Sequence, residues 1–238
     1  MMVFRSEVRT HLDLFSGIGG FALAARWAGL ETLQFVEIDS FAQKVLKKNF
    51  PGVPIHDDIK TFDATQLCQP FLLTGGYPCQ PFSQAGKRRG KEDDRHLWPE
   101  MLRVIRECRP TWILAENVAG HISMGLDTVL ADLESEDYST RTFVIPACAK
   151  DAPHRRDRVW IVANAQHSAD RTNSRQEDRP GWKEGSQWPI EPNVGRVAHG
   201  IPKRVDRLRG LGNAIVPQVA YEIINALKGK ENETHHCR

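Results

Sequence analysis

A single cysteine in a proline-containing stretch is the first feature of this sequence that could do chemistry. Cys79 lies in GGYPCQPFS (residues 75–83), between Pro78 and Pro81. The thiolate is the nucleophilic form of cysteine, and it needs a partly exposed or electropositive site to form. Because the two prolines fix φ and remove backbone donors, we expect Cys79 on a rigid bend rather than packed inside a strand.

The neighbours of Cys79 argue against a zinc-dependent base deaminase. Those enzymes carry H-x-E followed by P-C-x-x-C. Here Phe82 stands where the second cysteine would be, and no H-x-E precedes it. The cysteines number five, an odd count, and none are spaced as C-x-x-C, which argues against disulfide, zinc-ribbon and redox frameworks. We interpret Cys68, Cys108 and Cys148 as inert thiols and Cys79 as the reactive one.

A glycine-rich turn and a later acid indicate a nucleoside-bearing cofactor. FSGIGG (residues 15–20) follows an apolar run, and such a turn lets backbone N–H groups approach a ligand closely. Glu37 lies 20 residues beyond Gly17, the interval at which an acid binds ribose hydroxyls in dinucleotide folds. The full G-x-G-x-x-G spacing is missing, so the pattern alone does not name the cofactor. Asp58 either caps a helix or accepts a hydrogen bond from an adenine amino group.

Charged residues later in the chain could hold a base or a phosphate. Glu116 ends an apolar run, and a carboxyl group with a raised pKa could bond N3 and the amine of a flipped pyrimidine. A surface residue or an ion-pair partner is the alternative for this glutamate. Arg156 and Arg158 alternate along the chain, so they project to one face, where guanidinium groups suit phosphate or base-carbonyl binding. The basic stretch KRRGK (residues 87–91) is a candidate lid that meets nucleic acid.

These residues fall at the ends of predicted strands. Strands alternating with helices predict an α/β fold, a doubly wound and mostly parallel sheet with both faces covered. Ligands of such sheets bind beyond the carboxyl ends of the strands, which is where Gly17, Glu37, Asp58, Cys79 and Glu116 are placed. The predicted strands are residues 11–15, 33–36, a short segment before 57, 70–74, 112–115, 141–145 and 158–163; the predicted helices cover 21–28, 41–46 capped by Ser40, 97–108, 126–133 and 216–227.

The composition is that of a soluble globular protein. The 238 residues are 40% hydrophobic and 26% charged, and the net charge of +2 neither requires nor excludes a nucleic-acid partner. No segment reaches the apolar length of a membrane span, and the N-terminus lacks a signal-peptide core. We therefore expect a cytoplasmic monomer with no membrane partner and no metal.

The chain divides into four predicted parts. Residues 1–163 form a catalytic and cofactor-binding domain. Residues 164–210 change to a polar, Asn-, Ser- and Arg-rich composition, which predicts either a largely disordered insert or a small irregular module that needs a partner to fold. Residues 211–228 carry an amphipathic helix that packs back on the first domain, and residues 229–238 form a polar tail.

The motifs together resemble those of the DNA cytosine-5 methyltransferases, in that family's usual order. The pairing of Pro-Cys-Gln with Glu-Asn-Val in one α/β chain is highly specific, and the Asp/Ser-Pro-Pro-Tyr pattern of amino-methylating enzymes does not occur. DLFSGIGGF (13–21), VEID (36–39) and DDI (57–59) resemble cofactor motifs, GGYPCQPFS (75–83) and ENV (116–118) the two catalytic motifs, RRDR (155–158) the arginine motif, and GNAIVPQVA (212–220) the motif that closes the cofactor pocket.

The resemblance implies methyl transfer from S-adenosyl-L-methionine to C5 of cytosine in double-stranded DNA. It implies that Cys79 adds to C6 of a flipped cytosine, that Glu116 holds N3 and the amino group, that Arg158 contacts the base carbonyl and that Arg156 contacts the nearby backbone. A base then removes the C5 proton, and Cys79 leaves. Expected around the cofactor are Phe15, Ser16, Gly17, Ile18, Gly19, Glu37, Ile38, Asp58, Ile59, Pro78, Asn213 and Ala214; expected on DNA are Gln80, Ser83, Lys87, Arg88, Arg89, Arg204 and Arg207.

The sequence departs from the family pattern in two places. His154 stands where the arginine motif usually opens with Gln, and only residues 164–210 stand where members carry a large target-recognition region. Recognition of the DNA sequence is therefore short, relaxed or supplied by a partner chain. Two other functions stay open, methylation of tRNA by the same chemistry and DNA binding without catalysis.

Overall fold

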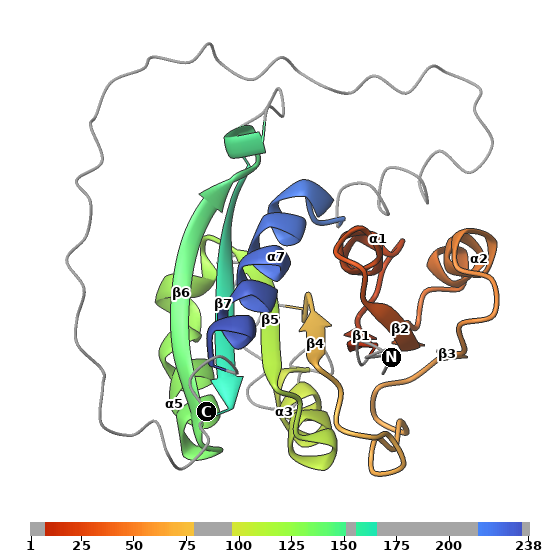
Figure 1. The fold of residues 1–238 in the computed structure, drawn as a ribbon, viewed down its shortest axis with the longest axis horizontal. Coiled ribbons are helices and arrows are strands. Elements are labelled where there is room, and N and C mark those ends of the chain that lie inside the picture. Colours follow the sequence, from red (N-terminus) through yellow and green to blue (C-terminus); the bar gives the residue numbers. More distant parts are fainter. Residues whose placement is uncertain (1–7, 79–96, 151–155, 166–213, 235–238) are drawn as a thin grey trace, which may run out of the picture.

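A seven-stranded sheet forms the centre of the molecule. The computed structural model describes residues 8–78, 97–150, 156–165 and 214–234, and the fold is given for these. The strands lie in the order β3-β2-β1-β4-β5-β7-β6 (Figure 1). Their bounds are β1 Thr10–Leu14, β2 Glu31–Val36, β3 Ile55–His56, β4 Leu72–Gly75, β5 Trp112–Val118, β6 Tyr138–Pro146 and β7 Asp157–Ala165.

The predicted mostly parallel sheet is confirmed, with one antiparallel strand. β7 runs antiparallel to both of its neighbours, β5 and β6, while the other neighbouring pairs are parallel. β6 and β7 are joined by a short connection containing the 3-10 turn η1 Ala147–Lys150, and a connection too short for a crossover requires antiparallel pairing. As a result, the start of β7 lies beside the carboxyl end of β5.

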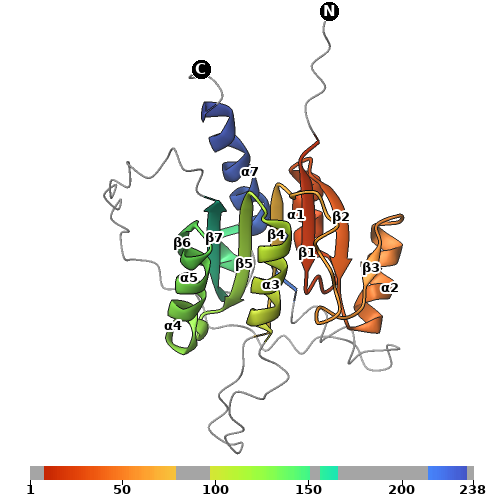
Figure 2. The same cartoon turned by 90° about the horizontal axis from the view of Figure 1, so that it is seen from below.

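Helices cover both faces of the sheet, and each face has its own apolar core. Leu12, Leu14 and Ile113 face α3 and α5, while Leu72 and Leu114 face α1 and α7. Figure 2 shows α3 and α5 in front of the strands and α7 behind them. The helices are α1 Gly20–Trp27, α2 Ser40–Asn49, α3 Trp98–Cys108, α4 His121–Met124, α5 Leu126–Ser135 and α7 Pro217–Thr234.

Two predicted helix boundaries are wrong. Ser40 is the first residue of α2 rather than its cap, because the side chain of Asp39 accepts the Ala42 N–H at 2.8 Å and takes the capping role. The last helix continues to Thr234 instead of ending at 228. Lys228 reinforces that helix, since its Nζ donates to the carbonyl of Ala28 and its own carbonyl accepts from Arg9 at 3.1 Å.

Candidate active site

Strand register brings the predicted site residues to one edge of the sheet. Leu14 pairs with both Val36 and Gly75, and Gly75 pairs in turn with Ala115. The residues that follow these four positions therefore emerge side by side at the carboxyl edge. They are Phe15 to Gly17 after β1, Glu37 after β2, Gly76 to Pro78 after β4 and Glu116 in β5.

The glycine-rich turn is built from left-handed backbone. Phe15 has φ 52°, which ends β1, and Gly17 and Gly19 have φ 54° and 89°. Glycine adopts this region without a steric penalty, whereas phenylalanine does not, so Phe15 stores strain in the turn. A Cβ on Gly17 would meet nothing within 4 Å, so open space lies beside the turn.

Glu37 ties this turn to β2. Its Oε2 accepts the Gly17 N–H at 2.7 Å and its Oε1 accepts the Asp39 N–H at 2.7 Å. The carboxyl group is buried, and burial raises its pKa while these backbone N–H groups lower it. Each oxygen keeps a lone pair for a further donor, so the carboxylate can also accept ligand hydroxyl groups.

The other predicted cofactor residues lie nearby with different exposures. Ser16 is buried, with its Oγ donating to the Asp13 carbonyl at 2.7 Å, and Ile38 is 76% exposed. Asp58 is half-buried, and its Oδ1 accepts the Lys60 N–H at 2.9 Å. The side chain of Ile59 belongs to the core, so a contact from Ile59 to a ligand would use its backbone.

The start of α1 packs against the segment that leads into α7. A Cβ on Gly20 would come 2.7 Å from Cγ1 of Ile215, so only glycine fits there without movement. The carbonyl of Ala214 accepts a hydrogen bond from Nη2 of Arg156 at 2.8 Å. These contacts bring the predicted cofactor residue Ala214 and the arginine motif together beside the glycine-rich turn.

Buried Glu116 and half-buried Arg158 form an ion pair at the carboxyl end of β5. Nε of Arg158 lies 2.9 Å from Oε1 of Glu116, although the angles do not fit a hydrogen bond. Glu116 is 8% exposed, and burial raises the pKa of its carboxyl group, with the charges of Arg158 and Arg156 opposing the shift. Burial and the charge of Arg158 lower the pKa of Arg156. An acid that stays protonated to higher pH is suited to donate a proton or hydrogen bond to a base nitrogen.

The segment that leads toward Cys79 lies against the same strand end. A Cβ on Gly76 would come 3.7 Å from Oε2 of Glu116. Nδ2 of Asn117 donates to the carbonyl of Tyr77 at 3.1 Å, and Pro78 is exposed. Sequence reasoning placed Cys79 and Glu116 at one edge. It missed Asn117 as a connector between the two segments, for which the place of Asn117 in the ENV motif was the available signal.

Several predicted site residues lie outside the described residues. Among the catalytic and cofactor predictions these are Cys79 and Asn213, together with His154 of the arginine motif. The same holds for all the predicted DNA contacts, Gln80, Ser83, Lys87, Arg88, Arg89, Arg204 and Arg207. Their roles therefore stay predictions.

Beneath the glycine-rich turn lies a buried polar network that the sequence did not reveal. Thr74 Oγ1 donates to Oδ1 of Asp13 at 2.6 Å, and Nε2 of His11 lies 2.8 Å from the same Thr74 oxygen. Since Thr74 has one proton and gives it to Asp13, Nε2 of a neutral His11 must carry the hydrogen, and Nδ1 then accepts from Thr32 at 3.0 Å. Alternation at 11 and 13 put these residues on one face, but nothing in the pattern marked both as buried.

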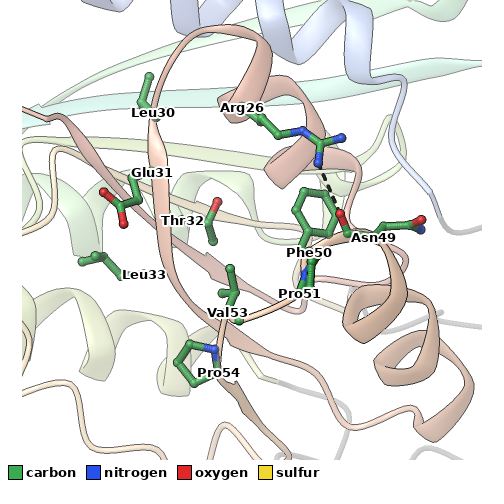
Figure 3. Close-up of a pocket in the computed structure, with 11 residues that line it drawn as sticks. Arg26, Leu30, Glu31, Thr32, Leu33, Asn49, Phe50, Pro51, Val53 and Pro54 are labelled. Atoms are coloured by element: carbon green, nitrogen blue, oxygen red, sulfur yellow. Dashed lines mark hydrogen bonds between the residues drawn. The ribbon is translucent and has the colours of Figure 1, made fainter.

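An open groove of about 640 Å³ lies at the opposite edge of the sheet (Figure 3). It is lined by the residues that begin β2 and precede β3. Arg26 lies over the ring of Phe50 at 4.8 Å and donates to the Asn49 carbonyl at 3.2 Å. The predicted site residues follow the carboxyl ends of the strands, so this groove is separate from them.

This mostly parallel seven-stranded sheet is that of the methyltransferase class of α/β proteins. The solved structure of the S. pombe Dnmt2 methyltransferase aligns with a TM-score of 0.57 and 26% identity, over 66% of this chain and 50% of that one. The family model of the C-5 cytosine-specific DNA methylases matches residues 9–194, and the chain belongs to that family.

Curated relatives match about two thirds of this chain. The type II methyltransferase M1.ScrFI of Lactococcus lactis subsp. cremoris is 39% identical over 157 residues, 63% of this chain and 40% of the relative. The type II methyltransferase M.Eco47II of Escherichia coli is 38% identical over 175 residues, 69% of this chain and 42% of the relative. The chain thus spans about two fifths of the length of these relatives.

Two further properties concern membrane-spanning helices and metal-binding side chains. Among the described residues, no helix is long and apolar enough to cross a membrane. The same residues contain no group of three or more His, Cys, Asp or Glu side chains placed to hold a metal ion.

Proposed function

We propose that this chain transfers a methyl group from S-adenosyl-L-methionine to C5 of cytosine in double-stranded DNA, with Cys79 as the nucleophile. Family membership supports the reaction class. The observation that carries the proposal is the ion pair of buried Glu116 with half-buried Arg158, which lies beside Gly76, three residues before Cys79. A carboxyl group with a raised pKa and a guanidinium group match the N3 and carbonyl sides of a cytosine ring.

Features of the carboxyl edge support S-adenosyl-L-methionine as the proposed cofactor. Open space beside Gly17 leaves room for a ligand against the glycine-rich turn, and the remaining lone pairs of Glu37 suit ribose hydroxyls. Exposed Ile38 offers an apolar surface to an adenine ring, and Asp58 lies at the end of the next strand. Bound there, S-adenosyl-L-methionine would supply a methyl group activated by a sulfonium centre.

The chain's own residues would act on the cytosine. The Cys79 thiolate adds to C6 and forms an S–C6 bond, which moves electron density to C5. Glu116, protonated, donates to N3 and stabilises this charge, while Arg158 hydrogen-bonds the base carbonyl. After methylation of C5, a base removes the C5 proton, the S–C6 bond breaks, the C5–C6 double bond re-forms and the thiolate is released.

Contacts with DNA are part of the same proposal. Gln80, Ser83, Lys87, Arg88, Arg89, Arg204 and Arg207 would bind phosphates and the bases flanking the target. Because only residues 164–210 lie between the strand of the arginine motif and the closing motif, we propose that recognition of the DNA sequence is short or relaxed, or is supplied by a partner chain.

Bisulfite sequencing tests this function. DNA free of 5-methylcytosine is incubated with the full chain and S-adenosyl-L-methionine, beside a Cys79→Ser variant and a Cys68→Ser control. We expect new 5-methylcytosine with the wild-type and Cys68→Ser chains only. No new 5-methylcytosine, or methylation that survives Cys79→Ser, would overturn the proposal, and methylation of a parallel tRNA sample alone would reassign the substrate.

A further inference from the structure

A buried hydrogen bond joins two residues for which the proposed chemistry has no use. The hydroxyl of Tyr77 and Nε2 of His121 are 2.7 Å apart, although 44 residues separate them in the chain. Tyr77 is 3% exposed and His121 is 5% exposed. Phenylalanine in place of Tyr77 and leucine in place of His121 would fill the same space without buried polar atoms that need hydrogen-bond partners. Packing alone therefore does not explain this pair.

The ring of Tyr77 is fixed from several sides. It packs against Trp98 with centroids 5.2 Å apart, and it meets the His121 ring edge-on at 5.5 Å. Trp98 is in turn held by α5, because its Nε1 donates to Oδ2 of Asp132 at 2.7 Å. Tyr77 is therefore anchored to α3, to α4 and, through Trp98, to α5.

The backbone of Tyr77 is fixed as well. Its carbonyl accepts the Asn117 hydrogen bond, while His121 stands four residues beyond Asn117 at the first position of α4. A Cβ on Gly125 would come 3.4 Å from Cε1 of His121, so the imidazole lies closely against the junction of α4 and α5. The backbone of Tyr77 is thus bonded to Asn117 and its side chain to His121. Both partners lie in the single segment that begins at Glu116.

We propose that Tyr77 and His121 form a positioning pair that fixes the exit of the Pro78–Cys79 segment relative to Glu116. This inference rests on the proposed function, because it gives the pair a role in the approach of the thiol to the base. Neither residue touches the reacting atoms. The hydrogen bond acts through Tyr77, two residues before Cys79, and removal of the hydroxyl alone should alter that geometry while the ring stays packed.

The test compares Tyr77→Phe and His121→Leu with Tyr138→Phe. The control loses a similar buried bond, from the Tyr138 hydroxyl to the Pro110 carbonyl at 2.8 Å, near the amino end of β5. We expect the first two variants to slow single-turnover methyl transfer about tenfold, with the KM for S-adenosyl-L-methionine unchanged. The double variant should be no slower than either single one, because both remove the same bond. His121→Gln, which keeps a polar nitrogen near the Nε2 position, should recover most of the rate.

A second readout does not depend on methyl transfer. Iodoacetamide alkylation of Cys79 is followed by mass spectrometry relative to the exposed Cys68 in the same molecule. We expect the Cys79 to Cys68 ratio to change at least twofold in Tyr77→Phe and His121→Leu but not in Tyr138→Phe. If the wild-type chain transfers no methyl group, the proposed function fails, and this ratio still decides whether the pair positions the segment.

Two outcomes would overturn the positioning role. One is a wild-type rate and an unchanged alkylation ratio in both variants. The other is a loss of rate that follows a matching loss of thermal stability and of cofactor binding, as a purely structural bond would give.

Discussion

The side-chain amide of Asn117 joins the end of β5 to the segment before Pro78. Nδ2 donates to the Tyr77 carbonyl at 3.1 Å, and Oδ1 accepts the Val118 N–H at 2.9 Å. Because both ends of the amide are used, its orientation is fixed. Asn117 therefore sets the position of Tyr77 against the strand that carries Glu116.

Asn117→Ala should reduce both stability and activity. The buried Tyr77 carbonyl would lose its partner, which costs about 1–3 kcal/mol of unfolding free energy. Methyl transfer should slow roughly tenfold or more, because a small misplacement of reacting groups is costly. Urea unfolding and single-turnover assays measure the two effects.

Asn164→Ala is the matched control for Asn117→Ala. Nδ2 of Asn164 donates to the Thr111 carbonyl at 3.3 Å, at the opposite end of β5. This variant should lose stability without a specific loss of rate. Equal rates for the two variants would remove the role assigned to Asn117.

Glu116→Gln should slow methyl transfer by about a hundredfold or more, the usual contribution of a general acid. Burial raises the pKa of Glu116, so the protonated form persists to higher pH and the wild-type rate should fall as pH rises through that pKa. The variant should lack this alkaline limb, because an amide does not titrate. Glu222→Gln, at an exposed pair with Lys150, is the control and should keep the wild-type pH–rate profile. An alkaline limb retained in Glu116→Gln would assign it to another group.

The sequence predicted the sheet and the strand-end placement of the site well, because these depend on local patterns. Apolar runs followed by Gly17, Glu37 and Glu116 are sufficient to place these residues at one edge of the sheet. The antiparallel direction of β7 follows from the short connection after β6, and no motif marks it.

Pairings between distant residues could not be predicted in the same way. The Tyr77–His121 bond and the contact of Gly20 with Ile215 depend on how whole elements pack, and the residue types alone do not specify them. The capping of α2 by Asp39 instead of Ser40 is a smaller case, since both residues can cap and backbone geometry decided between them.

Glu37→Gln should weaken cofactor binding. The wild-type carboxylate accepts from Gly17 and Asp39 with separate oxygens, so a glutamine must turn its NH₂ group toward one of two N–H donors. The substitution also removes the charged acceptor that Glu37 offers to a ligand hydroxyl, and a hydrogen bond to a charged group contributes about 1.5–3 kcal/mol, so the Kd should weaken roughly ten- to hundredfold. Calorimetric titration with S-adenosyl-L-methionine measures the change. Glu31→Gln, at the exposed start of β2, should bind as the wild type does, and an equal loss there would count against a specific role for Glu37.

Asp13→Asn should change how stability depends on pH. Burial raises the pKa of Asp13 from 3.8 to about 7, so between these values the folded state holds a proton that the unfolded state has released. The contribution of Asp13 to stability is therefore present at low pH and is lost as pH rises through this window. Burial lowers the pKa of His11 from 6.5 to about 3, and this shift makes stability rise with pH between these values. The effect of His11 is the same in the wild type and in Asp13→Asn.

The difference between Asp13→Asn and the wild type isolates the term from Asp13. The two proteins can differ in unfolding free energy already at pH 4. From pH 4 to pH 8 this difference should change in favour of the variant. Urea unfolding at several pH values measures this difference. A constant difference across the range would show that Asp13 ionises normally in the folded protein.

Gly20→Ala should destabilise the junction between α1 and the segment that precedes α7. A Cβ at position 20 would lie 2.7 Å from Cγ1 of Ile215, so the isoleucine must move, at a cost of about 1–3 kcal/mol. Cofactor affinity should fall with it, because Ala214 adjoins the displaced residue. Adding Ile215→Ala removes the clashing atom and should restore part of the affinity lost to Gly20→Ala.

Gly229→Ala is the control for Gly20→Ala. A Cβ there meets nothing within 4 Å, and alanine favours the helical backbone of α7, so stability should stay equal or rise by up to about 1 kcal/mol. Thermal unfolding with and without S-adenosyl-L-methionine distinguishes the variants. If Gly20→Ala keeps wild-type stability and affinity, the close approach of Ile215 does not constrain the cofactor crevice.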